Sequence, residues 1–146
     1  LGKPMKIAIG ADHGGFELKQ KIISLLKSLN HDIYDAGCSS TQSVDYPSFA
    51  EAVCEKIIRD ESEVGILICG TGIGMSIAAN RNKKIRAANC HNEYTARMSR
   101  EHNDANILCI GARVLGEGVV EDIVRIWLET DFAGGRHQQR VQQYSE

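Results

Sequence analysis

Short runs of apolar and β-branched residues alternate along the chain with segments of helical periodicity, and this alternation limits the fold more than any other feature. It is typical of βαβ units, in which helices join parallel strands and cover both faces of the sheet. The predicted strands span residues 6–10, 32–35, 64–69, 85–90 and 107–111. We therefore expect an α/β fold, a doubly wound, Rossmann-like, five-stranded parallel sheet with helices on both faces.

The segments between and after these strands carry apolar residues at three- and four-residue spacing, which predicts amphipathic helices. The positions are Phe16, Ile22, Ile23, Leu26 and Leu29, then Phe49, Val53 and Ile57, and finally Val120, Ile123, Val124 and Trp127. The length of 146 residues suits one domain over residues 1–146. Residues 1–4 precede Met5 and are interpreted as a remnant of the expression vector, with a native extension as the alternative.

Charge and cysteine usage exclude several classes of partner. Seventeen Lys and Arg residues oppose nineteen Asp and Glu residues, so the chain lacks the basic excess that would attract nucleic acid. Its apolar runs are far shorter than the ~20 residues of a membrane span, so we expect a soluble protein that does not contact membranes. The five cysteines are irregularly spaced and no signal-like N-terminus precedes them, which favours the reducing cytoplasm.

The strongest local signal is the loop at residues 69–76, Cys-Gly-Thr-Gly-Ile-Gly-Met-Ser, which follows the third predicted strand. Its three alternate glycines let backbone N–H groups approach an oxyanion, and the helix that follows adds about half a positive charge at its N-terminus. We expect this loop to bind an anion; a turn needed only for close strand–helix packing is the alternative. The loop at residues 11–15 is also rich in unusual residues, and the two loops are predicted to lie side by side where the winding of the sheet reverses.

Three well-known phosphate-binding motifs do not fit the 69–76 loop. The dinucleotide fingerprint is G-x-G-x-x-G, whereas the glycines here are spaced G-x-G-x-G. The Gly-Lys-Ser/Thr ending of nucleotide hydrolases is absent, and a cysteine phosphatase would need an arginine where Met75 stands. The pattern therefore predicts a small anionic substrate and no nucleotide or nicotinamide cofactor.

Cys69 differs from the other cysteines by its position. Cys54, Cys90 and Cys109 are interpreted as small core residues. A thiolate at Cys69 would be stabilised by the loop amides and the following helix, so this residue can act as a base or a nucleophile. The five histidines show no metal-ligand spacing, and no metal is expected.

Arg136 and Arg140 are four residues apart and follow two glycines, so they would lie on one face of a C-terminal helix. A solvated tail is the alternative for this segment. His13 and His102 lie in polar loop segments, where a histidine taken alone is more often a loop or cap residue.

Six ordered motifs together resemble those of type B ribose-5-phosphate isomerases over residues 5–141. They are Asp12-His-Gly-Gly, Val44-Asp-Tyr-Pro, Cys69-Gly-Thr-Gly-Ile-Gly, Arg100-Glu-His-Asn-Asp, Gly111-Ala-Arg-Val and Gly135-Arg-His-Gln-Gln-Arg. The resemblance implies an aldose–ketose isomerase of the pentose phosphate pathway that interconverts ribose 5-phosphate and ribulose 5-phosphate through an enediolate without a metal. It also implies a homodimer with its active site between the subunits, and it leaves a tetramer open.

The resemblance further implies a role for each matched residue. Cys69 is the proton-shuttling base, and the enediolate oxygen is stabilised by the amides of Gly70, Thr71, Gly72, Ile73 and Gly74. His102 is the acid that opens the furanose ring, while Asn103 orients the substrate. The ring oxygen and hydroxyls are contacted by Asp12, Tyr46 and Thr71. The phosphate is held by His13, Arg113, Arg136 and Arg140.

Two alternatives remain at this point. One is an allose-6-phosphate or galactose-6-phosphate isomerase of the same family, which would share the fold and the enediolate chemistry. The other is a non-catalytic module that binds a sugar phosphate through the same loop and arginines.

Overall fold

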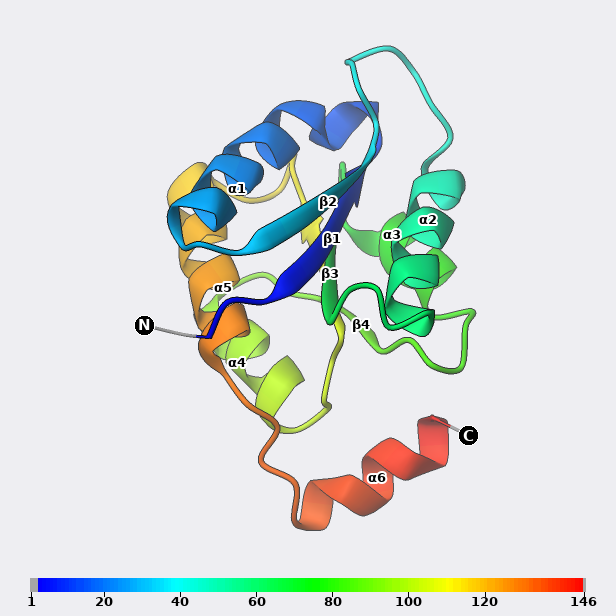
Figure 1. Ribbon diagram of the computed structural model, residues 1–146, viewed down its shortest axis with the longest axis vertical. Helices are drawn as coiled ribbons and strands as arrows, with labels where there is room; N and C mark the ends of the chain where they lie inside the picture. The colour runs from blue at the N-terminus through cyan, green and yellow to red at the C-terminus, as the bar shows by residue number, and fades with distance from the viewer. Residues whose placement is uncertain (1–2, 146) are drawn as a thin grey trace.

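The computed structural model describes residues 3–145; Leu1 and Gly2, which belong to the predicted vector remnant, and Glu146 lie outside the described residues. Within that range the chain forms a five-stranded sheet in which every strand pair is parallel, in the order β2-β1-β3-β5-β4 (Figure 1). The strands are β1 (Lys6–Ala11), β2 (Asp32–Gly37), β3 (Val64–Cys69), β4 (Ala87–Asn89) and β5 (Ile107–Gly111). The predicted α/β fold is confirmed.

The helices connect these strands and extend beyond the last one. They are the short 3₁₀ helix η1 (His13–Gly15), then α1 (Phe16–Ser28), α2 (Tyr46–Ile58), α3 (Ile73–Ala79), α4 (Glu93–Glu101), α5 (Glu117–Glu129) and α6 (Arg136–Tyr144). Pro47 lies in the first turn of α2. Backbone N–H groups there have no acceptor within the helix, so the N–H that proline lacks costs no hydrogen bond. Asn92 and Thr95 form a reciprocal capping box at the start of α4.

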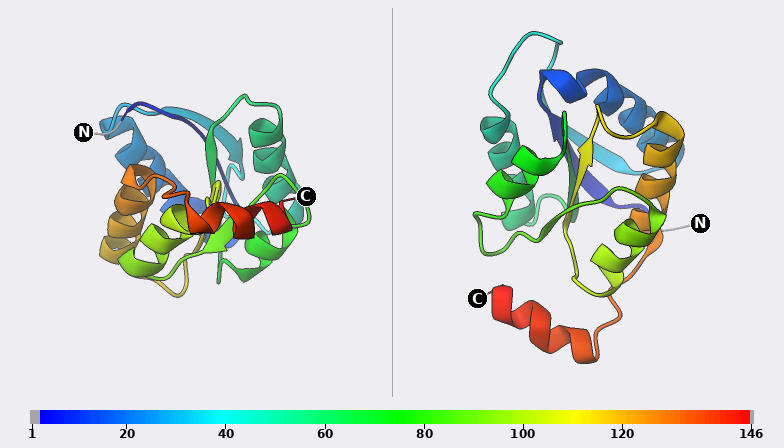
Figure 2. Two further views of the ribbon diagram at one scale, coloured as in Figure 1. Left: turned by 90° about the horizontal axis from the view of Figure 1, so that it is seen from below. Right: turned by 180° about the vertical axis from the view of Figure 1, so that it is seen from behind.

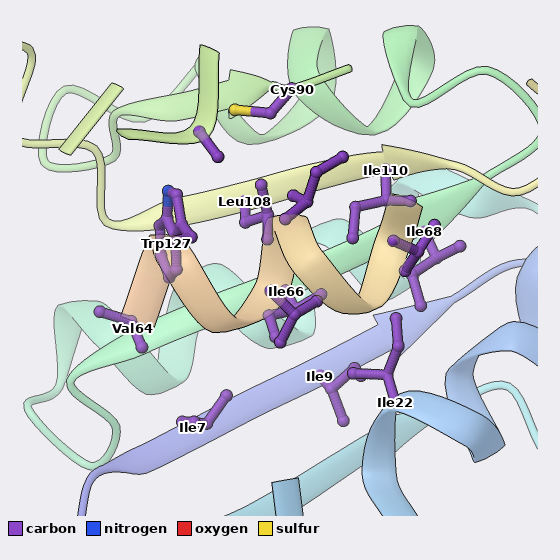
Figure 3. Close-up of a cluster of buried hydrophobic side chains, with 14 of the residues drawn as sticks. Ile7, Ile9, Ile22, Val64, Ile66, Ile68, Cys90, Leu108, Ile110 and Trp127 are labelled. Carbon is purple, nitrogen blue, oxygen red and sulfur yellow. The ribbon is translucent and has the colours of Figure 1, made fainter. Parts of the chain in front are cut away.

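Two hydrophobic clusters fix the helices on opposite faces of the sheet. On one face, isoleucines of β1 and β3 and residues of β5 pack against α1, α4 and α5, with the fully buried Trp127 among them (Figure 3). On the other face, alternate residues of the same strands, among them Leu67 and Cys69, pack against α2 and α3. Because strand side chains alternate between faces, the near-continuous apolar runs of the sequence serve both clusters.

The loops that follow β1 and β3 lie side by side, as predicted, because these two strands are hydrogen-bonded neighbours. The Asp12 N–H donates to the Ile68 carbonyl at 3.1 Å, which joins the two strand ends directly. The prediction for the fourth strand was too long: residues 85–90 were expected, and only Ala87–Asn89 pair with β5.

The C-terminal helix α6 lies beyond the amino ends of the strands, apart from the other helices (Figures 1 and 2). The Ala133 N–H donates to the Glu101 carbonyl at the end of α4, and the Tyr144 hydroxyl donates to the Asn103 carbonyl at 3.1 Å. None of the helices in residues 3–145 combines the length and the apolar character that a membrane span requires.

Candidate functional site

The loop after β3 brings a backbone amide onto the sulfur of Cys69. The Gly72 N–H donates to Cys69 Sγ at 3.2 Å, and the cysteine is only 5% exposed. Gly72 has φ +80°, a left-handed conformation that glycine adopts without steric cost, and it directly precedes the first turn of α3. The thiol therefore faces a donor that would stabilise its thiolate form.

Neighbouring backbone and side chains hold this loop closely. A Cβ added at Gly74 would lie 2.8 Å from the ring of Tyr46, so only glycine lets the tyrosine cover the start of α3. A Cβ added at Gly111 would lie 2.6 Å from the Thr71 carbonyl oxygen, so β5 also packs directly on the loop. The Thr71 hydroxyl accepts a hydrogen bond from the Ile73 N–H at 3.1 Å.

Arg113 connects the loop after β3 to the loop after β1. The backbone N–H of Arg113 donates to the Gly70 carbonyl at 3.0 Å. Cβ atoms added at Gly70 and Gly14 would each lie 3.4 Å from a guanidinium nitrogen of Arg113. The cation thus lies between the two loops, at the edge of the sheet where an anionic substrate would be bound.

Asp12 and His13 are also oriented by the backbone. Asp12 Oδ1 accepts from the Gly15 N–H at 3.2 Å and caps η1. His13 Nδ1 accepts from the Val44 N–H at 3.2 Å. A neutral His13 therefore carries its proton on Nε2, which is then available as a donor to substrate.

Three other buried thiols, Cys54, Cys90 and Cys109, differ from Cys69 in their surroundings. Desolvation by burial, with the nearby Glu51 carboxylate, raises the pKa of Cys54 to about 11. Burial also raises the pKa of Cys90, and it raises the pKa of Cys109 well above the ordinary thiol value. These three thiols stay protonated at neutral pH, which fits their interpretation as core residues.

His102 and Asn103 lie at the other end of the sheet, because α4 runs back from the carboxyl end of β4 and ends at Glu101. The rings of His102 and His137 are stacked, with centroids 4.2 Å apart and planes inclined by 14°. Desolvation, followed by the charges of His102, Arg136 and Arg140, lowers the pKa of His137. Arg136 and Arg140 lie on α6, so the predicted helix is present.

The residues predicted for one site thus fall into two groups within the chain. We define the carboxyl-end cluster as Asp12, His13, Tyr46, Cys69, Gly70, Thr71, Gly72, Ile73, Gly74 and Arg113, and the amino-end cluster as His102, Asn103, Arg136 and Arg140. β3 has six residues and lies between the two ends, and a strand of that length spans about 17–20 Å.

Two residues that contact these clusters were not singled out from the sequence. Asn89, at the end of β4, donates through Nδ2 to the Thr71 carbonyl at 3.3 Å. His137 stacks on His102. The signal available for the first contact was an asparagine inside the predicted fourth strand, whereas the stack depends on where α6 lies. Among residues 3–145, no three His, Cys, Asp or Glu side chains converge in a metal-ligating group.

Known proteins resemble this chain over nearly its whole length. The Ribose/Galactose Isomerase family pattern matches residues 7–144. A relative named Ribose-5-phosphate isomerase B from Escherichia coli is 47% identical over 137 residues, which cover 94% of this chain and 92% of the relative. A putative sugar phosphate isomerase, YwlF of Bacillus subtilis, is 50% identical over 97% of this chain and 96% of its own.

Solved structures agree with these sequence relatives. The Ribose-5-Phosphate Isomerase B of Clostridium thermocellum superposes with a TM-score of 0.95 at 52% identity, covering 97% of this chain and 95% of that chain. The enzyme of Thermotoga maritima superposes with a TM-score of 0.95 at 46% identity, covering 97% of each chain. The resemblance inferred from the six motifs is confirmed, and the chain belongs to the ribose/galactose isomerase family.

Proposed function

We propose that this chain is an aldose–ketose isomerase that interconverts D-ribose 5-phosphate and D-ribulose 5-phosphate through an enediolate. The observation that carries the proposal is the Gly72 N–H on Cys69 Sγ, inside a glycine-rich loop at the carboxyl end of β3. This arrangement suits a thiolate base beside donors for a developing oxyanion. The names of the relatives and of the solved structures support the substrate.

The isomerisation requires a proton to move between neighbouring carbons. The Cys69 thiolate removes the C2 proton of open-chain ribose 5-phosphate, and the electron pair of that C–H bond moves toward the C1 carbonyl oxygen, which becomes the enediolate oxygen. The thiol then returns a proton to C1, while the hydroxyl proton on O2 is lost and O1 is protonated. The Gly72 amide contacts Cys69 Sγ, and the amides of the Gly70–Gly74 segment are assigned as the donors to the oxyanion.

Ring opening and phosphate binding are assigned to other groups. His102 gives a proton to the ring oxygen of the closed furanose and so acts as the general acid of ring opening. Asp12, Tyr46 and Thr71 contact the ring oxygen and hydroxyls, and Asn103 orients the substrate. The phosphate is held by His13, Arg113, Arg136 and Arg140, and a bound phosphate keeps the reacting carbons in place.

We further propose a homodimer in which the carboxyl-end cluster of one copy meets the amino-end cluster of the other. Within one chain the strands separate these clusters by about 17–20 Å, a span that a five-carbon phosphate ester does not bridge. Two exposed isoleucines on α3, Ile73 at 56% and Ile77 at 64%, lie next to the Cys69 loop and would be covered by a second copy. The proposed setting is sugar-phosphate metabolism of the cytoplasm, in the pentose phosphate pathway.

A coupled assay that follows ribulose 5-phosphate formation tests the function directly. We expect turnover of ribose 5-phosphate, very poor turnover of free ribose, and a higher kcat/KM for ribose 5-phosphate than for allose 6-phosphate or galactose 6-phosphate. A relative at 37% identity is named as a galactose-6-phosphate isomerase subunit, which is why the hexose phosphates are included. Binding of ribose 5-phosphate without isomerisation would contradict the proposal and indicate a binding module.

A further inference from the structure

Asn89 reaches from the edge strand β4 to the peptide bond between Thr71 and Gly72. Its Nδ2 donates to the Thr71 carbonyl at 3.3 Å, and a Cβ added at Gly72 would overlap Asn89 Oδ1. Among residues 3–145, this Oδ1 is buried and has no hydrogen-bond partner. The amide side chain therefore lies directly against the loop and makes one hydrogen bond there.

The carbonyl that Asn89 contacts belongs to the same peptide unit as the amide that contacts Cys69. The Thr71 C=O and the Gly72 N–H lie in one plane, so a side chain that fixes the carbonyl also fixes the direction of the N–H. A hydrogen bond accepted by the carbonyl polarises the peptide and strengthens the bond that its N–H donates. That donated bond is the 3.2 Å contact from Gly72 to Cys69 Sγ.

We propose that Asn89 is a positioning residue that aims and polarises the Gly72 amide toward the Cys69 thiolate. It touches neither the substrate nor the sulfur and acts through the Thr71–Gly72 peptide. The catalytic use of the thiolate rests on the proposed function, whereas the effect of Asn89 on the sulfur does not depend on any substrate.

Other groups also face the Cys69 loop and contribute to the electrostatic potential at its thiol. Arg113 lies beside Gly70, Asp12 and His13 come from the end of β1 and η1, Tyr46 comes from α2, and Cys109 lies on β5. Helix α3 supplies no titratable side chain within Ile73–Ala79. In the described residues, Asn89 is the side chain whose donor is bonded to the Thr71 carbonyl, so its replacement changes that peptide and leaves the charged groups in place.

The test measures the pH dependence of Cys69 alkylation by iodoacetamide, followed on the Cys69 peptide by mass spectrometry. In Asn89→Leu, which removes the donor at similar volume, the midpoint of the curve should move to higher pH by about 0.5–1 unit. In Asn89→Asp, which is nearly isosteric but presents a carboxylate, the shift should be in the same direction and larger. In the ribose 5-phosphate assay, kcat of Asn89→Leu should fall about three- to tenfold at pH 7 while KM changes less than about twofold.

Asn80→Ala is the matched control. Asn80 holds the start of β4 through two hydrogen bonds with the Ala87 backbone, at 2.8 and 2.9 Å, so this variant loosens β4 without touching Thr71. It should lower the melting temperature and leave the alkylation midpoint unchanged. The proposal is overturned by an unshifted midpoint in a folded Asn89→Leu or Asn89→Asp protein, or by an equal shift in Asn80→Ala. If the protein lacks isomerase activity and the midpoint still moves, the proposed function fails and the role of Asn89 at the sulfur stands.

Discussion

The two ends of the sheet hold their functional side chains in different ways. In the carboxyl-end cluster, backbone contacts fix each group: the Gly72 amide on Cys69, the Gly15 amide on Asp12 and the Val44 amide on His13. In the amino-end cluster, two of the four residues lie on α6, where Val141 is the buried residue and the neighbouring positions are exposed or half-buried. One end is built into the fold and the other rests on its surface.

This difference matches what each end has to do. Stabilising charge that develops in a transition state requires donors that do not reorganise during the reaction. Holding a phosphate requires charge and bidentate geometry, which long arginine side chains deliver from a less rigid helix. Under the proposed function, the rigid end suits enolisation, and the peripheral end suits binding of the phosphate of a substrate held by a second copy.

Removing the base at the rigid end should have the largest effect. We expect Cys69→Ala to lower kcat by about 10²–10⁴ while affinity for a phosphate-bearing ligand stays near that of the unaltered protein. Iodoacetamide should inactivate the unaltered protein, and substrate should protect it. Cys54→Ala is the control, because Cys54 is a buried thiol of α2 whose raised pKa keeps it protonated. Near-normal turnover in Cys69→Ala would contradict this role of Cys69 and make Asp12 or Asp45 the candidate base.

Removing the acid at the peripheral end should stop net conversion and spare enolisation. In His102→Ala, net turnover should fall about 10²-fold in both directions, because the overall equilibrium constant links the two kcat/KM values. Deuterium incorporation at C1 of ribulose 5-phosphate needs the base and the enediolate, so NMR should still detect it in His102→Ala and not in Cys69→Ala. Loss of exchange in a folded His102→Ala protein, as complete as in Cys69→Ala, would mean that His102 takes part in enolisation.

The arginines of α6 should affect binding more than chemistry. Arg136→Ala or Arg140→Ala should weaken substrate binding by about 1.5–3 kcal/mol per charged hydrogen bond lost, which is roughly a 10- to 150-fold rise in KM. Arg125→Ala is the control, since Arg125 is an exposed arginine of α5 paired with Glu121. Unchanged kinetic constants in both α6 variants would mean that this segment is a solvated tail that does not bind the phosphate.

Mixing two inactive variants tests whether the two ends meet across a dimer. Cys69→Ala and His102→Ala, unfolded together and refolded in equal amounts, should form mixed dimers with one intact site. Random pairing then restores about one quarter of the activity of the unaltered protein, which is about 25-fold above His102→Ala alone and at least that far above Cys69→Ala alone. If both clusters of one chain formed a single site, the mixture would stay as inactive as its components.

The fold could be predicted because its signals are local. The strand at residues 64–69 was predicted with its observed bounds, since a six-residue apolar run followed by glycines has no competing interpretation as a longer helix. Helix α4 was not singled out: its buried residues are Ala96 and Ser99, which are too small to produce an apolar period. Residues 85, 86 and 90 were predicted as strand from their apolar or β-branched neighbours. β4 pairs with β5 alone, and it begins after residue 86 and ends before residue 90.

Only the parts of the site that lie in recognisable sequence motifs could be predicted. The Cys69 loop was predicted from its alternate glycines, and its adjacency to the Asp12 loop from the unusual residues of both loops, because ligands of open α/β sheets bind where the winding reverses. The pairing of β1 with β3 confirms that adjacency. The contact of Asn89 with Thr71 joins residues 18 apart through a side-chain amide, and no periodicity encodes that. The position of Arg136 and Arg140 likewise depends on where the segment after α5 runs, which neither the motifs nor their order reveals.

The smallest effect expected at the peripheral end is a pH dependence of α6 docking. Desolvation, His102 and the two arginines lower the pKa of His137, with Glu101 acting in the opposite direction. Docked α6 therefore favours the neutral imidazole, and undocked α6, where histidine has its ordinary pKa near 6.5, binds the proton more readily. Docking is fully stable above about pH 6.5 and weakens as pH falls toward the lower pKa of docked His137.

Hydrogen exchange compares the two ends in a single experiment. Between pH 7.5 and 5.5, protection factors corrected for intrinsic exchange should fall for the amides of α6 and stay constant for those of β3, whose six residues are all buried. His137→Gln keeps a polar side chain that does not titrate, so its α6 protection should no longer depend on pH. A His137→Gln protein with the same acid response would assign it to His102 or Glu101, which face the same ring. Equal loss of protection in β3 would mean that acid destabilises the whole fold, and the two ends would then not differ in the way their side chains are held.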